Sequence, residues 1–128
     1  MSNIPADLKY TKSHEWVRTL ANGNVEIGIT DHAQGALGDL VFVEVPEAGK
    51  TLKAGDAFAV VESVKAASDV YAPIAGAVLE GNPSLAAAPE LINSEPYAGG
   101  WIARMKPNGA PPGLLSAAEY QAHLAAEG

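Results

Sequence analysis

One lysine, Lys65, stands between two stretches that have the composition of β-strands. The strand-like run Val60–Val64 precedes it, small residues follow it, and a second strand-like stretch resumes at Asp69–Tyr71. Gly55 lies ten residues before Lys65 and Gly76 eleven after it, so the lysine is nearly centred between two turn glycines. A hairpin with one amine at its tip suits a covalently attached swinging arm. We therefore interpret Lys65 as the attachment point of such an arm.

The elements that must position this hairpin are short strands separated by regular turns. The pattern predicts strands over 16–20, 25–29, 40–45, 58–64, 69–71, 77–80 and 101–106, with a short extended piece at 51–56. It also predicts one or two helical turns over 30–38, capped by Thr30 or Asp31 and ended by Gly38, and a short helix from Asn82 to about Ala87. Many short strands joined by regular turns are typical of a mostly antiparallel barrel or sandwich.

The C-terminal part is predicted to be a linker followed by a helix. Residues 108–113 are rich in proline and glycine, and the helix is placed at 114–126. Ser116 and Glu119 have the spacing of a capping box. With 128 residues, the whole chain 1–128 is expected to be a single domain.

Composition and charge exclude several functional classes. The formal net charge of −7 argues against nucleic-acid binding, and the absence of cysteine excludes disulfides, thiolate nucleophiles and cysteine metal sites. No apolar stretch approaches the roughly 20 residues that span a bilayer, and the first residues lack the features of a signal or transit peptide. We therefore expect no membrane partner and a soluble internal compartment.

Catalytic and metal-binding motifs are also missing. The three histidines, His14, His32 and His123, are scattered along the sequence without metal-ligand spacing, so no metal site is expected. No phosphate-binding glycine loop and no nucleophile elbow occurs. The sequence therefore does not predict an enzyme that acts alone.

Motifs over nearly the whole chain resemble one known family, the lipoyl-bearing H proteins of the glycine cleavage system. The stretches that carry the resemblance are Tyr10–Val17, Gly28–Gln34, Leu37–Glu44, Val61–Asp69, Ala72–Gly76, Leu91–Ser94 and Gly100–Trp101. The resemblance implies a flattened antiparallel barrel-sandwich hybrid of the lipoyl/biotinyl type, with short helices and a C-terminal helix. It also implies that Lys65 carries lipoate in amide linkage.

The same resemblance implies a carrier function and its partners. Members of the family shuttle an aminomethyl group from glycine decarboxylase (P protein) to aminomethyltransferase (T protein), and present the dihydrolipoyl arm to dihydrolipoamide dehydrogenase (L protein). Attachment of the cofactor requires a lipoate ligase, or an octanoyltransferase together with lipoyl synthase. The implied location is cytoplasmic in bacteria, or the mitochondrial matrix for a mature eukaryotic form.

A cleft that shelters the loaded arm is a further expectation, because water promotes breakdown of the aminomethyl cargo to formaldehyde and ammonia. The cargo amine is cationic, so the cleft needs an oxygen or carboxylate partner. By resemblance, the residues of this cleft are Ser13, Glu15, Ala66 and Asp69. Glu15 and Asp69 are expected to contact the amine, although Asp69 could instead stabilise a turn.

The residues before the lysine are expected to serve its modification. Glu62 and Ser63 are predicted to help the lipoyl-attaching enzymes recognise the hairpin. A biotin carrier would be expected to have methionines where Val64 and Ala66 flank Lys65. The alternatives are an H-like protein that relays lipoyl or octanoyl groups, which would share Lys65, and a lipoyl module of a 2-oxo acid dehydrogenase.

Overall fold

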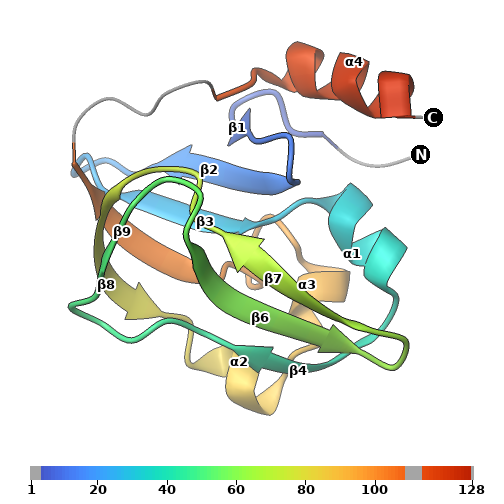
Figure 1. Cartoon of the computed structure of the whole chain (residues 1–128), viewed down its shortest axis with the longest axis horizontal. Coiled ribbons are helices and arrows are strands. Elements are labelled where there is room, and N and C mark those ends of the chain that lie inside the picture. The colour runs from blue at the N-terminus through green and yellow to red at the C-terminus, as the bar shows by residue number, and fades with distance from the viewer. Residues whose placement is uncertain (1–3, 109–113, 128) are drawn as a thin grey trace.

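The computed structural model describes residues 4–108 and 114–127, without the side chain of Glu127, as two antiparallel sheets (Figure 1). The larger sheet has the strand order β1-β2-β3-β9-β8-β5, and the smaller has the order β4-β6-β7. The strands of the larger sheet are β1 (Lys9–Tyr10), β2 (Glu15–Thr19), β3 (Val25–Ile29), β5 (Thr51–Leu52), β8 (Gly76–Gly81) and β9 (Ala103–Pro107). Those of the smaller sheet are β4 (Leu40–Glu44), β6 (Ala57–Ser63) and β7 (Ala67–Tyr71). The helices are α1 (Asp31–Leu37), α2 (Ser84–Ala87), α3 (Leu91–Ser94) and α4 (Ala117–Glu127).

The main core lies between the two sheets and is built mainly from aliphatic side chains, with Phe58 as its one aromatic residue among those described. Inward-facing residues of both sheets supply it, including Ile27, Val61 and Met105. A smaller second cluster lies beneath α4 and contains Leu8, Tyr10, Trp16 and Tyr120. Figure 1 shows α4 over β1, on the side of the larger sheet away from the β6–β7 hairpin.

Trp16 and Gly28 are directly opposed on β2 and β3 and explain the close packing of these strands. A Cβ added to Gly28 would come within 2.7 Å of the Trp16 ring, so only glycine leaves room for the indole. The indole N–H donates to the Pro96 carbonyl at 2.8 Å. This pair fixes the strand that carries Glu15.

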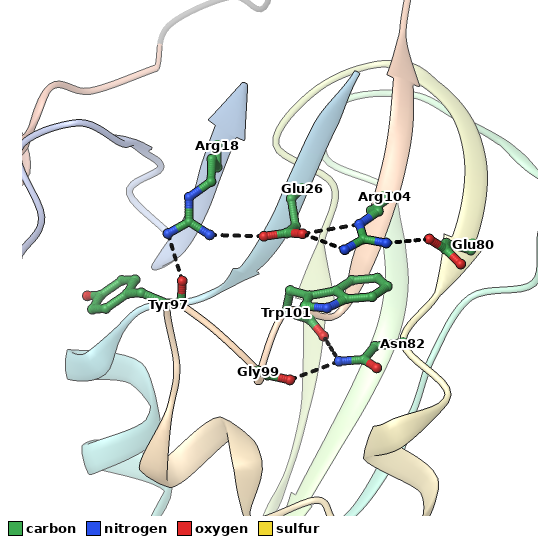
Figure 2. Close-up of polar contacts among 8 residues, drawn as sticks. All are labelled: Arg18, Glu26, Glu80, Asn82, Tyr97, Gly99, Trp101 and Arg104. Carbon is green, nitrogen blue, oxygen red and sulfur yellow. Dashed lines mark hydrogen bonds and ion pairs between the residues drawn. The ribbon is translucent and has the colours of Figure 1, made fainter. Parts of the chain in front are cut away.

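A polar network covers the outer face of the larger sheet (Figure 2). The buried Glu26 accepts from Arg18 at 2.9 Å and from Arg104 at 3.1 Å, and Arg104 also contacts Glu80. Register places Arg18 and Arg104 opposite Glu26 on the two flanking strands. The Arg104 guanidinium lies 4.1 Å from the centre of the Trp101 ring. Glu26 is thus a buried carboxylate that is fully paired within the chain.

Most predicted elements are confirmed within one or two residues, but two short ones were not predicted. β1 and α3 are too short to show a periodic pattern. The terminal helix begins at Ala117 rather than 114, because Ser116 caps it and Leu115 forms an antiparallel bridge with Tyr10. Residues 109–113 of the predicted linker lie outside the described residues.

No helix in the described part of the chain combines the length and apolar character needed to cross a bilayer.

Candidate functional site

Lys65 lies at the tip of the β6–β7 hairpin, as the sequence predicts. The turn is closed by the Ser63 N–H, which donates to the Ala66 carbonyl at 2.8 Å. The Ser63 hydroxyl lies inside the turn and accepts from the N–H groups of Lys65 and Ala66, both at 3.1 Å. Val64 and Lys65 are left exposed at the tip, where the Val64 N–H also donates to the Asp39 carbonyl at 3.4 Å. Figure 1 shows this hairpin extending past the other strands.

The Lys65 side chain passes over the end of α1. A Cβ added to Gly38 would lie 3.2 Å from the lysine Cε, so glycine keeps this path open. Gly38 has φ of 85° and ψ of −163°, a conformation that favours glycine independently of the space it leaves. No salt bridge or hydrogen bond holds the Lys65 ammonium among residues 4–108 and 114–127. The Lys65 ammonium is therefore exposed, and glycine at position 38 leaves room for the lysine side chain at the end of α1.

A cavity of about 200 Å³ lies between α1, the turn before β2 and the strands β6 and β7. Three of the four predicted cleft residues line it: Ser13, Glu15 and Asp69. The fourth, Ala66, lies instead in the hairpin tip beside Lys65. Because α1 has seven residues, its length is about 10 Å.

Glu15 is the most deeply buried acid of the cavity, with 2% of its surface exposed. Its Oε1 accepts from the Ser13 hydroxyl at 2.5 Å and from the Thr11 hydroxyl at 2.8 Å. Burial raises the pKa of this carboxyl, and hydrogen bonds from Ser13, Thr11 and the Tyr71 backbone oppose that rise. Within the described residues no cation pairs with it. The carboxylate thus has neutral donors and lacks a positive charge.

Asp69 is placed differently from Glu15. It is exposed and borders two cavities, the one just described and a second of about 430 Å³ on the outer face of the smaller sheet. Cross-strand register sets it beside Val60, and strand alternation turns its side chain away from the side that Val70 buries. Asp69 therefore lies at the rim of the cleft, at the edge strand β7.

The three histidines, which are scattered along the sequence, lie close to one another in the structure. The ring centres of His14 and His32 are 4.8 Å apart, and those of His14 and His123 are 6.0 Å apart. His14 and His32 line the same cavity as Glu15. Among the described residues, no group of three potential ligands has a geometry that could hold a metal. The first contact joins residues 18 positions apart and the second joins residues 109 apart, so no pattern within a few neighbouring residues could have revealed them.

His14 also has a special backbone conformation. Its φ is 73°, a value that costs a residue with a Cβ on the order of 1 kcal/mol. This conformation occurs in the turn that presents Ser13 and Glu15 to the cavity. The turn is thus held in a strained shape at the wall of the cleft, where strain is commonly found in proteins.

The comparisons with known proteins agree with the fold and with the resemblance of the motifs. The family model of the glycine cleavage H-protein matches residues 8–127. A glycine cleavage system H protein of Halorhodospira halophila is 60% identical, with all of both chains covered. One from Escherichia coli O7:K1 is 56% identical over 97% of this chain and 98% of its own length.

The solved structures include a close neighbour. The crystal structure of a glycine cleavage system H protein from Mycobacterium marinum has a TM-score of 0.88 and 41% identity, covering 95% of this chain and 99% of that one. The lipoyl-type, two-sheet fold expected from the motifs is therefore confirmed. With a family match over residues 8–127 and relatives that are 60% and 56% identical over nearly the whole chain, this chain belongs to the glycine cleavage H-protein family.

Proposed function

We propose that this chain, a carrier protein of the glycine cleavage system by its family, carries lipoate on Lys65 and uses it to move an aminomethyl group. The P protein supplies the group, the T protein takes it, and the L protein reoxidises the arm. When attached, lipoate supplies the sulfur chemistry that a chain without cysteine lacks. The chain itself positions and shelters the arm and performs no bond-breaking step of its own.

Two features of the structure fit such an arm. Lys65 is exposed at a projecting tip, and Gly38 leaves room for its side chain at the end of α1. The cavity that α1 helps to line contains the acid Glu15. Glu62 and Ser63 lie at the base of the tip, and Ser63 shapes the turn, which supports a role in recognition by the lipoate ligase or octanoyltransferase.

The proposal rests mainly on the surroundings of one cleft carboxyl, that of Glu15. Glu15 is buried with hydroxyl and backbone donors but, among the described residues, without a cation. The ammonium of an aminomethyl cargo would complete this site with a charge-assisted hydrogen bond. We propose that Glu15 makes this contact, that Ser13 orients the carboxylate, and that Asp69 adds charge at the rim.

Intact mass tests the attachment directly. Wild type, Lys65→Arg and the control Lys53→Arg would each be incubated with a lipoate ligase, lipoate and ATP. Lys53 is an exposed lysine in another turn, so its replacement controls for the loss of one amine. We expect one lipoyl group on wild type and on Lys53→Arg and none on Lys65→Arg. An unmodified wild type, or a modified Lys65→Arg, would overturn the assignment of Lys65.

A further inference from the structure

Tyr120 on the C-terminal helix is fully buried and hydrogen bonds to two segments far from it in sequence. Its hydroxyl lies 2.8 Å from Nδ1 of His14 and 2.7 Å from the Thr30 hydroxyl. Its ring stacks on Tyr10, with ring centres 4.7 Å apart and an interplanar angle of 7°. Stacking on Tyr10 explains why an aromatic ring stands at position 120. The hydroxyl has a separate role, because it links the segment of His14 to the segment of Thr30.

The first piece is the turn before β2. His14 lies between Ser13 and Glu15, so the position of its backbone decides how both side chains face the cavity. The His14 N–H donates to the Thr11 carbonyl at 3.1 Å, but φ at His14 is 73° and the turn is strained. The hydrogen bond to Tyr120 restrains the imidazole and with it this strained residue.

The second piece is the start of α1, which forms the opposite wall of the cavity. Thr30 caps this helix by accepting from the Ala33 N–H at 3.2 Å, and its own N–H donates to the His14 carbonyl at 3.0 Å. His32 and Ala33, in the first turn of the helix, line the cavity. The Thr30 hydroxyl that caps α1 is the same group that Tyr120 contacts.

We infer that Tyr120 is a positioning residue for the cleft, holding its two walls at a fixed separation through His14 and Thr30. Tyr120 does not line the cavity, so it acts through these two residues. Since this inference rests on the proposed function, the consequence is that the C-terminal helix sets how well the loaded arm is protected from water. Loss of the Tyr120 hydroxyl would then weaken protection of the cargo and leave the attachment site, Lys65, unchanged.

Hydrogen exchange on the unmodified chain tests the inference without any cargo. Tyr120→Phe removes the hydroxyl and keeps the stacked ring. The control is Tyr10→Phe, which removes the neighbouring buried hydroxyl that donates to the Pro5 carbonyl and also keeps the stack. We expect exchange of the His14, Thr30 and Ala33 amides to accelerate about two- to tenfold in Tyr120→Phe, the effect of one lost net hydrogen bond. Equal acceleration in both variants, or none in either, would overturn the inference.

A second measurement uses the lipoylated, aminomethyl-loaded protein without T protein and follows formaldehyde release. We expect release to be about two- to tenfold faster in Tyr120→Phe than in wild type, while the rate of lipoylation of Lys65 is the same. Ser116→Ala, which weakens the cap of α4 but keeps the phenol, controls for simple fraying of the helix. Equal acceleration in Ser116→Ala and Tyr120→Phe at matched loss of thermal stability would contradict the positioning role.

Formaldehyde release distinguishes a failure of the sheltering function from a failure of the role of Tyr120. If wild type released formaldehyde as fast as free aminomethyl-dihydrolipoamide, the sheltering function itself would fall, and the inference with it. If wild type were sheltered and Tyr120→Phe were equally sheltered, only the inference would fall.

Discussion

Two buried glutamates on adjacent strands, Glu15 and Glu26, are partnered in opposite ways. Glu26 is 6% exposed and lies between the guanidinium groups of Arg18 and Arg104 (Figure 2). Glu15 is 2% exposed and accepts from hydroxyl and backbone donors, with no cation among the described residues. Burying a charge is costly unless it is paired. Glu26 is therefore a structural acid, whereas the different partners of Glu15 support its proposed contact with the cargo ammonium.

The largest difference between the two acids is expected in protection of the cargo. Glu15→Gln would remove the proposed charge-assisted hydrogen bond to the aminomethyl amine, so spontaneous formaldehyde release should rise about ten- to hundredfold. Glu26→Gln is the matched control and should change this rate less than about twofold. Release would be followed in the loaded protein without T protein. Equal rates in wild type and Glu15→Gln would remove the proposed role of Glu15.

The free energy of unfolding should fall more in Glu26→Gln than in Glu15→Gln, the reverse of the order expected for formaldehyde release. Glu26→Gln leaves Arg18 and Arg104 without their shared carboxylate and should lower the free energy of unfolding by about 1–3 kcal/mol. Glu15→Gln should cost less, because the amide oxygen can still accept from Ser13 and Thr11 while the desolvation penalty of a charge disappears. Urea unfolding of both variants at neutral pH checks this. A larger loss in Glu15→Gln would show that the two acids are not distinguished by their partners.

The pH dependence of stability follows from the raised pKa of Glu15. Burial raises its pKa in the folded state above the ordinary value of 4.5, so folding favours the protonated form. The contribution of Glu15 to stability is therefore greatest below pH 4.5 and is lost as the pH rises through the folded-state pKa. The free energy of unfolding of Glu15→Gln, relative to wild type, should increase between about pH 4 and pH 7. A difference that stays constant or falls would mean that burial does not penalise the charged form.

The smallest effect is expected at Asp69. Its side chain is exposed at the rim, where solvent screens its attraction for a cargo amine. Asp69→Asn should therefore raise formaldehyde release less than about threefold, and added salt should reduce the difference from wild type. Measuring release at low and high salt tests this. An effect as large as that of Glu15→Gln would place Asp69 inside the cleft and not at its rim.

The sequence was most informative where contacts are local. Lys65 is held by a turn of four residues, and α1 is bounded by Thr30 and Gly38, which lie next to it in sequence. The capping box of Ser116 and Glu119 was predicted for the same reason, although the start of its helix was placed too early. Signals of this kind act over three or four residues and can be read directly from the chain.

The cleft is assembled from distant segments, and the sequence alone could identify it only in part. The resemblance named Ser13, Glu15 and Asp69, but it could not show that Asp69 lies at an edge or that Glu15 is buried without a cation. The link from His14 to Tyr120 spans 106 residues and has no sequence signature. Tertiary packing, and not local propensity, decides these contacts.

The ionisation of Glu15 is the most direct test of its proposed contact with the cargo amine. Carboxyl NMR would follow the titration of Glu15 in the oxidised lipoyl protein and in the aminomethyl-loaded protein. A cation bound at this carboxylate favours its ionised form, so the pKa of Glu15 should be lower in the loaded protein. An unchanged or higher pKa on loading would show that the amine does not reach Glu15, and would contradict the claim.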